Sequence, residues 1–414
     1  MSVRERRWYS RSDAQERAKE LAKKAGREEF WREYLENAKE QLKTDPRRSA
    51  WICHYRAGDT WHIKTFDKKK DAAAYHDKVR VDVKEGVHTA PSKSITVKQA
   101  AADWIRFVEG EKRERSTIVG YQQHIDRHIL PRIGTLKIAT LTTPRIQKFR
   151  DDLLADLSRP MAKKVLTSLK SLLRDAKRRG NVAQNVALDV SIKMGKRDQR
   201  KLKVGVDIPT RDEIKALVDK ARGRWRPFFL LAIFTGLRSS ELRGLRWEDV
   251  NFPKSVLHVH QRADRWGKID KPKSSAGERT VPIPPLVLNA LREWKLNCPK
   301  VRGEQLELVF PNGKGRVENH ANIINRGFMP LQKAAGVVTK SGKPKYPGLH
   351  SLRHFYASWC INRRAEGGLE LPLKMVQARM GHASIQMTAD VYGHLFPSSD
   401  DSAELEAAAR SLLG

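Results

Sequence analysis

The amino-acid sequence predicts a multidomain α+β protein that is mainly helical and contains small β-sheets. A chain of 414 residues is too long for one compact core, so about two to four domains are expected. Two stretches, 51–66 and 256–284, alternate apolar and polar side chains as strands do. Most of the remaining chain has the apolar spacing of amphipathic helices.

The pattern changes within the first 90 residues. Residues 1–48 are rich in Ala, Glu, Lys and Leu and predict a basic, charged helical extension with Ser12 as its N-cap. Residues 49–90 predict a small domain of a β-sheet and a helix. There "AWICHYRAGDTWHIKTF" favours two strands around a turn at 58–59, and "DKKKDAAAYHDKVRVDVKEG" favours a helix.

Basic and aromatic side chains share this small predicted sheet, which leaves two interpretations open. Such a sheet can enter a DNA groove as a β-ribbon does. Alternatively, Trp51 and Trp61 are core residues of a packing module.

Residues 95–190 predict a helical domain. "STIVGYQQHIDRHILPRIG" predicts a helix with Ser116 as its cap, ended by a proline and a glycine. In "MAKKVLTSLKSLLRDAKRRG", Val165, Leu169 and Leu172 share one face, and lysines and arginines occupy the other. The basic surplus of the whole chain favours phosphate contacts for that charged face.

Residues 191–206 predict a basic linker, because they have many cations and little apolar periodicity. Residues 207–414 predict a mainly helical domain with a two- or three-stranded sheet within "VLHVHQRADRWGKIDKPKSSAGERTVPIP" and a short amphipathic helix in the tail.

Charge points to a polyanion as the partner. The chain has 81 Lys and Arg against 48 Asp and Glu, a net charge of +33, which favours nucleic acid. The basic residues are spread along the chain rather than gathered on one amphipathic helix, which disfavours a membrane surface. The longest apolar run, "PFFLLAIFTGL", is far shorter than the roughly 20 residues that span a bilayer. Three widely separated cysteines suit free thiols, so we expect an intracellular protein.

Three patterns that suggest a bound cofactor or metal depart from the motifs they resemble. "GVVTKSGKP" departs from a phosphate-binding loop, because its glycines are too far apart and Pro344 replaces the Ser or Thr. His350 and His354 have the spacing of a zinc-binding helix but lack the glutamate of a metalloprotease. Cys53 and its neighbouring histidines fit no standard zinc site. No metal is therefore expected.

Polar residues within apolar helical surroundings are more informative. Arg238 follows an apolar helix and is either paired with Glu241 or a ligand for phosphate. His350 and Arg353 are three apart and share a helix face, and "MGHASIQMTADVYGH" adds a histidine and Tyr392. Arginines bind the oxygens of a reacting phosphodiester, a tyrosine hydroxyl can attack phosphorus, and a lysine or histidine can protonate the leaving oxygen.

"TGLRSSELRGLRWEDVNF", "HSLRHFYASW" and "MGHASIQMTADVYGH" resemble, in order and spacing, the three signature boxes of the tyrosine site-specific recombinases, the phage integrase family. The resemblance covers about 205–398 closely. It implies catalytic roles for the residues at the matching positions, which are Arg238, His350, Arg353, His382 and Tyr392, the nucleophile. "KPKSSAGERTVPIP" is similar to the family's β-hairpin, which implies Lys273 as the catalytic lysine, with Lys271 as the alternative. Glu241 is expected to orient an arginine, and His394 is expected to be an ordinary helix residue.

Upstream, 95–190 resembles the family's core-binding domain and 49–90 the small domain that binds arm-type DNA sites in lambda-type integrases. The resemblance implies a 3'-phosphotyrosine intermediate, no cofactor, and a homotetramer on double-stranded DNA. It also implies integration and excision of a phage or mobile element in the bacterial cytoplasm or nucleoid, with a directionality factor or a DNA-bending host protein as further partners. A type IB topoisomerase and a non-catalytic DNA-binding regulator remain the alternatives.

Overall fold

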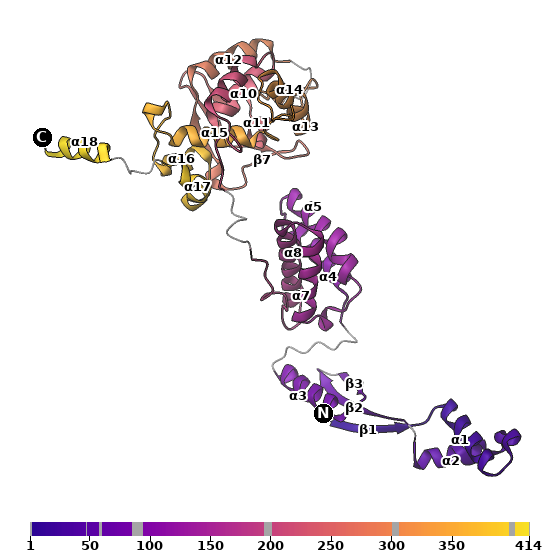
Figure 1. Ribbon diagram of the computed structural model, residues 1–414. Helices are drawn as coiled ribbons and strands as arrows, with labels where there is room; N and C mark the ends of the chain where they lie inside the picture. Colours follow the sequence, from indigo (N-terminus) through magenta and orange to yellow (C-terminus); the bar gives the residue numbers. More distant parts are fainter. Residues whose placement is uncertain are drawn as a thin grey trace. The chain divides into compact units, whose positions relative to one another are not determined.

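The computed structural model describes residues 2–46, 48–57, 60–84, 94–193, 201–299, 306–396 and 402–413. The chain divides into two compact units, Met1–Lys196 and Arg197–Gly414 (Figure 1). Each unit combines helices with small antiparallel sheets, which confirms the predicted α+β class. None of the helices in these described ranges is long and apolar enough to cross a membrane.

The N-terminal part is built on a three-stranded antiparallel sheet. Its order is β1 (Ser2–Trp8), β2 (Arg48–Ala57) and β3 (Thr60–Phe66). Helix α3 (Lys69–Lys84) packs on one face, where Cys53 and Tyr55 meet Val79. The predicted strands and helix are present; the predicted turn at 58–59 lies outside the described residues.

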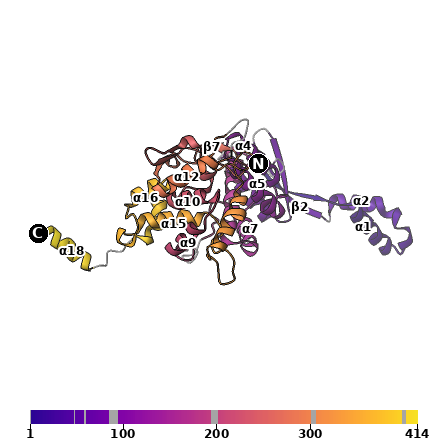
Figure 2. The ribbon, with the colours of Figure 1, turned by 90° about the horizontal axis from the view of Figure 1, so that it is seen from above.

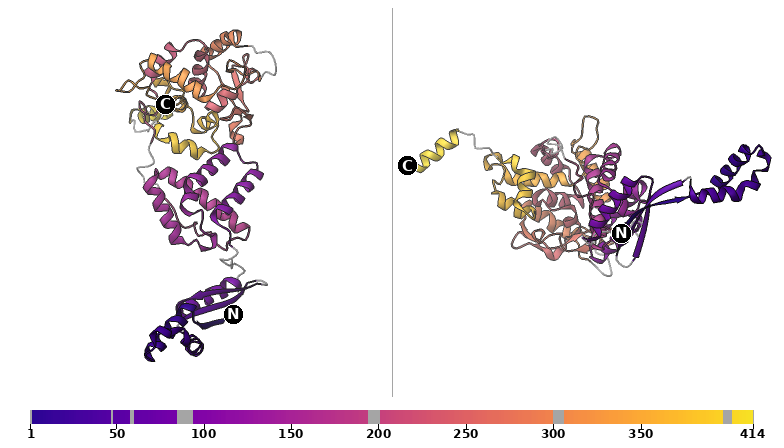
Figure 3. Two further views of the ribbon diagram at one scale, coloured as in Figure 1. Left: turned by 90° about the vertical axis from the view of Figure 1, so that its right-hand side faces the viewer. Right: turned by 90° about the horizontal axis from the view of Figure 1, so that it is seen from below.

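The prediction of a helical segment over 1–48 is wrong at its start. Ser2–Trp8 form a strand because they pair with β2, with Val3 opposite Cys53. Between these strands the chain forms a helical hairpin, seen at one end of the sheet in Figure 3. The hairpin consists of α1 (Arg11–Lys24), the 3-10 turn η1 (Glu28–Tyr34) and α2 (Leu35–Thr44).

The N-cap of α1 is Ser10 rather than the predicted Ser12. Ser10 Oγ accepts the amide of Asp13 at 3.2 Å, and Asp13 Oδ2 accepts the amide of Ser10 at 2.6 Å. This reciprocal pair satisfies two amides of the first helical turn.

The face of the sheet opposite α3 is exposed where it carries Trp61 and Ile63, although Ile52 on the same face is buried. Trp61 and Ile63 are 61% and 64% exposed, and Arg56 lies opposite Trp61 in the register. Trp51 is half-buried, with Lys69 Nζ 5.3 Å from its ring centre. Trp61 is therefore not a core residue, and an aromatic and a cationic side chain share the open face.

The remainder of this unit is a helical bundle. Val165, Leu169 and Leu172 are buried, and Lys163 and Lys164 are exposed, as the amphipathic pattern predicted. The predicted cap Ser116 is wrong, because its helix already starts one residue earlier. The helical segments are α4 (Val97–Gly110), α5 (Arg115–His124), η2 (Ile125–Ile129), α6 (Leu130–Ile133), η3 (Ile138–Thr140), α7 (Thr143–Asp156) and α8 (Arg159–Arg178).

The C-terminal unit packs helices around the apolar helix α10, which lies beside α15 in Figures 1 and 2. The predicted sheet is three-stranded, in the order β4-β5-β8, and a separate two-stranded hairpin pairs β6 with β7. The strands are β4 (Val250–Asn251), β5 (Val256–Val259), β6 (Arg262–Ala263), β7 (Ile269–Asp270) and β8 (Arg279–Pro282). The helices are α9 (Arg211–Lys220), α10 (Trp225–Thr235), α11 (Ser239–Gly244), α12 (Pro285–Asn297), α13 (His320–Asn322), α14 (Met329–Ala334), α15 (His350–Ile361), α16 (Leu373–Met380), α17 (Ile385–Tyr392) and α18 (Ser402–Leu413). Short turns of other helix types are η5 (Trp247–Asp249), η6 (Ser275–Gly277), η7 (Ile323–Phe328), η8 (Arg364–Glu366) and η9 (Gly393–Leu395).

Candidate active site

Arg238 is placed by the abrupt end of α10. The chain turns at Gly236, which has a left-handed φ of 60°, and Arg238 then becomes the N-cap of α11. Its Nη1 donates to Glu241 Oε1 at 2.8 Å, and its Nη2 donates to the carbonyl oxygen of Gly381 at 2.9 Å. The pairing with Glu241 left open by the sequence is therefore present. The Arg238 side chain is still 35% exposed, so the guanidinium can also reach a ligand.

Arg353 is buried and joins the ends of two helices. It donates to the carbonyl oxygen of Gly236, after α10, at 2.5 Å, and to that of Met380, the last residue of α16. Burial and the neighbouring Arg238 lower the pKa of Arg353 to about 9, against the opposing effect of Glu241. The guanidinium therefore remains charged at neutral pH and supplies a fixed positive field.

A third arginine, Arg279 on β8, completes this group. Its Nη2 and Nη1 donate to Glu241 Oε2 and Oε1 at 2.9 and 3.2 Å, and its Nε donates to the carbonyl oxygen of Arg379 at 2.8 Å. Burial alone would raise the pKa of Glu241. The opposing effect of Arg279, Arg238 and then Arg353 is larger and lowers this pKa to about 2. Glu241 is thus an ionised carboxylate that binds two arginines. Sequence patterns do not identify Arg279, because its partner Glu241 is distant in sequence.

Tyr392 ends α17 and is 1% exposed. Its hydroxyl lies 2.8 Å from Nδ1 of His354, and its ring is stacked on that of His382 at 6.2 Å between centres. Burial raises the pKa of Tyr392 to about 12, and the charges of Arg353 and Arg238 act in the opposite direction. The side chain is therefore both a packing residue and a hydroxyl held beside histidines.

The histidines around Tyr392 are neutral at neutral pH. Burial, with His350 and Arg353, lowers the pKa of His354 to about 4; burial, with Arg353 and Arg238, lowers that of His382 to about 4. His382 Nδ1 is bonded to Thr388 Oγ1 at 2.9 Å. His350 meets His354 edge-on at 4.7 Å, so the two histidines that were considered and rejected as zinc ligands form part of this group.

Among the described residues, no hydrogen bond or ion pair joins Lys273 to this group. Lys273 lies exposed between β7 and β8, as does Lys271, so the choice between the two lysines stays a prediction. The following turn is anchored, because the carbonyl oxygen of Gly277 accepts from Arg279 at 2.9 Å. The lysines are therefore tethered next to the arginine group by an exposed segment.

His394 is more than an ordinary helix residue. In the turn η9 after Tyr392, its Nε2 lies 2.7 Å from the carbonyl oxygen of Leu202, and Leu395 packs among the same residues as Leu202. These contacts attach the segment after Tyr392 to the start of the C-terminal unit.

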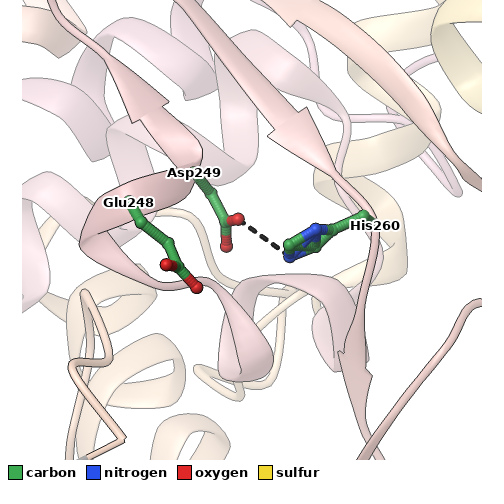
Figure 4. Close-up of side chains that lie close together, drawn as sticks. All are labelled: Glu248, Asp249 and His260. Carbon is green, nitrogen blue, oxygen red and sulfur yellow. Dashed lines mark ion pairs between the residues drawn. The ribbon is translucent and has the colours of Figure 1, made fainter.

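One group in the described residues has donors close enough for a metal ion: Glu248, Asp249 and His260 (Figure 4). His260 Nε2 lies 3.0 Å from Asp249 Oδ1, and Asp249 Oδ2 accepts the amide of Arg246 at 2.8 Å. Arg246 also pairs with Glu248 at 3.1 Å. Asp249 therefore caps the turn at Arg246, and Glu248 pairs with the Arg246 side chain. Because the two carboxylates already have these partners, we assign no metal to the group.

Replacing Gly236 with alanine is expected to destabilise the C-terminal unit strongly. A Cβ there would lie 2.3 Å from Cδ1 of Tyr356, in addition to the strained left-handed backbone. Gly336→Ala is the control, because Gly336 has a φ of 69° but no atom within 4 Å of its Cβ position. In denaturant titrations the control should lose about 1–2 kcal/mol and Gly236→Ala roughly 1–3 kcal/mol more. Equal losses would show that the Tyr356 ring moves aside at no cost.

Comparisons with known proteins agree with this architecture. The phage integrase family matches residues 209–398, and the phage integrase N-terminal SAM-like domain matches 96–154. A protein named Tyrosine recombinase XerC-like, from Caldanaerobacter subterraneus subsp. tengcongensis, is 27% identical and covers 81% of this chain and 88% of its own. An integrase of Streptomyces ambofaciens is 24% identical and covers 85% and 91%.

Two solved structures share the fold. The Tn1549 transposon integrase in complex with a circular intermediate DNA has a TM-score of 0.62 and 21% identity, covering 76% of this chain and 99% of that one. A lambda integrase dimer bound to a core site has a TM-score of 0.53 and 18% identity, covering 82% and 91%. By its matches to both phage integrase models and to the named recombinase, the chain belongs to the phage integrase family of tyrosine recombinases.

Proposed function

We propose that the protein is a site-specific DNA recombinase that breaks and rejoins DNA through a covalent 3'-phosphotyrosine. The observation that carries this proposal is the cluster of Tyr392 with Arg238 and Arg353. Arg238 donates to the carbonyl oxygen of Gly381, beside His382, whose ring stacks on Tyr392. Arg353 is followed directly by His354, which contacts the Tyr392 hydroxyl. A phosphodiester bound by the two arginines would place phosphorus beside the nucleophile, and burial strengthens every charge interaction there.

The reaction exchanges one phosphodiester for another. Arg238, Arg353 and His382 hold the non-bridging oxygens, and the Tyr392 oxygen bonds to phosphorus as the bond to the 5'-oxygen breaks. Lys273 protonates that leaving oxygen, and His350 assists proton transfer from and to the tyrosine. The ester is conserved in the covalent link, so the exchange needs neither ATP nor a metal ion.

The proposed DNA contacts extend beyond this cluster. We assign residues 95–190 and 207–414 to core-site binding, joined by the basic linker 191–206, and 49–90 to arm-type sites. The open sheet face with Trp61 and Arg56 supports the last assignment, because it offers an aromatic wedge and a cation to a groove. The setting is the bacterial cytoplasm or nucleoid. There the enzyme integrates and excises a phage or mobile element, with a directionality factor or a DNA-bending host protein as further partners.

The decisive experiment is to recover and sequence DNA that stays bound to the protein after denaturation. One recurrent site, linked through its 3'-phosphate to Tyr392 on peptide mapping, is expected. Supercoiled plasmid without that site distinguishes the main alternative, since rapid relaxation would indicate a type IB topoisomerase. A complete absence of covalent DNA would instead favour a non-catalytic DNA-binding regulator.

Salt should weaken DNA binding steeply. With a net charge of +33, most of the affinity is expected to come from phosphate contacts that release counterions. Gel shifts should lose roughly 10³-fold in affinity or more between about 50 and 200 mM salt. A flat response would contradict a phosphate-dominated interface.

The homotetramer is expected to depend on the tail. Helix α18 ends in Leu412 and Leu413, both 85% exposed, which suits packing onto a neighbouring subunit. Deleting 400–414 should weaken tetramer formation on DNA, measured by sedimentation, while binding of one protomer to one site is retained. Unchanged assembly would favour a tail that packs on its own subunit.

A further inference from the structure

His354 is the side chain in direct contact with the hydroxyl of Tyr392. Its Nδ1 lies 2.8 Å from that oxygen, and the two rings are 5.7 Å apart at 61°. His354 is one helical turn after His350 on α15 and immediately follows Arg353, so the backbone that fixes the buried arginine also fixes this imidazole.

We propose that His354 is a further catalytic residue, which accepts the phenolic proton of Tyr392 as the tyrosine attacks phosphorus. This role rests on the proposed recombinase function. The O–H bond of Tyr392 breaks as its proton moves to His354 Nδ1, and the same oxygen forms the bond to phosphorus. The bond to the 5'-oxygen breaks and that oxygen takes a proton from Lys273. In the reverse step, His354 returns its proton to the phenol.

The other histidines are less suited to this transfer. Nδ1 of His382 is already bonded to Thr388, and its ring lies parallel to that of Tyr392, at 3°, rather than pointing a nitrogen at the hydroxyl. His350 contacts the ring of His354, so it assists the proton transfer through His354.

A bound DNA phosphate would make His354 a better proton acceptor than it is in the free protein. The charged and titratable groups acting on it are His350 and Arg353 from α15, Asp207 from the segment before α9, and Tyr392 itself. His354 is neutral in the free protein, so it can accept a proton. Burial, and then the charges of His350 and Arg353, lower the pKa of His354; a bound phosphate would offset the charge of Arg353 and make His354 a better base.

The test uses the full-length protein and a nicked duplex containing the recovered site, with sulfur in place of the scissile 5'-oxygen. Because a thiolate leaves without protonation, adduct formation on this substrate should depend little on Lys273. A slower rate then reports a defect in activation of the Tyr392 hydroxyl. His354→Ala removes the contact. His354→Gln retains a hydrogen-bonding side chain that does not take up a proton at neutral pH. His258→Ala, on β5 and outside the site, is the matched histidine control.

Both His354 variants should bind DNA normally but form the covalent adduct about 10²-fold more slowly, whereas the control keeps the full rate. Their rates should rise about tenfold per pH unit between about pH 6 and 9, because phenolate must then form without a base, while the wild type stays flat. Placing 3,5-difluorotyrosine, a more acidic phenol, at position 392 of the His354 variants should raise their rate of adduct formation at least about tenfold.

If His354→Gln forms the adduct at the wild-type rate, His354 does not accept the proton of Tyr392 and only positions its hydroxyl. If His354→Ala does not fold, judged by melting and DNA binding, His354→Gln decides alone; no recovery with the fluorinated tyrosine would also refute the proposal. An adduct that forms normally in every His354 variant would refute this inference but not the recombinase. No adduct in the wild type would refute both.

Discussion

Replacing Tyr392 with phenylalanine is expected to abolish the covalent protein–DNA complex while leaving DNA binding intact. The substitution removes only the hydroxyl oxygen that would attack phosphorus, and the ring still fills its buried place in the C-terminal unit. His354 loses its partner, which should cost about 1–2 kcal/mol of stability, too little to unfold the unit. The measurement is a denaturing gel of protein incubated with nicked target DNA.

Tyr346→Phe provides a matched control. Tyr346 is also 1% exposed, and its hydroxyl donates to Glu213 at 2.6 Å, so it loses a comparable buried hydrogen bond. Tyr346 lies outside the arginine and histidine group, and its variant should form the adduct at the wild-type level. Equal adduct yields from Tyr392→Phe and the wild type would rule out Tyr392 as the nucleophile.

Local sequence patterns predicted the elements whose cause is local. The apolar face of α8, the alternation of β2 and β3, and the apolar run that ends at Gly236 all come from side-chain spacing within one element. The prediction failed where the cause is distant. β1 is a strand because residues 40 to 52 positions later pair with it, and its own sequence, SVRERRW, lacks an apolar alternation.

The same distinction applies to the candidate site. Arg238, His350, Arg353, His382 and Tyr392 stand in motifs whose resemblance to the family's signature boxes implied them, and the structure brings them together. His354 stands beside Arg353 in the same motif, but its sequence pattern suggests only a zinc ligand. Its contact with Tyr392 depends on how α15 packs against α17, which the sequence does not show. Arg279 likewise owes its position to Glu241, which lies on another element.

Lys273 stays the least determined of the predicted site residues. It is exposed on the segment between β7 and β8, and no hydrogen bond or ion pair among the described residues joins it to the arginine group, although Gly277 and Arg279 anchor the end of that segment. A phosphate between Arg238 and this segment would give the lysine an anionic partner, which none of the described residues offers it.

Glu241→Gln is expected to cost about 3–5 kcal/mol of stability, because it leaves Arg238, Arg279 and Arg353 close together without their shared anion. For a unit of this size, this corresponds to a melting temperature lower by roughly 6–20 °C. Glu248→Gln is the matched control, since that carboxylate is 59% exposed and pairs only at the surface. It should change stability by no more than about 0.5 kcal/mol.

Acid should erase the difference between the wild type and Glu241→Gln. The folded state holds the pKa of Glu241 near 2, below its ordinary value of 4.5, so its contribution is complete above about pH 4.5 and disappears as the pH falls through 2. Denaturant titrations at several pH values should therefore show a gap that is constant near neutrality and closes on acidification. A gap independent of pH would mean that Glu241 stabilises by packing and hydrogen bonding rather than by charge. Since Arg238 and Arg353 are proposed to hold the reacting phosphate, a charge-dependent gap would also indicate that one carboxylate fixes the phosphate-binding groups before DNA arrives.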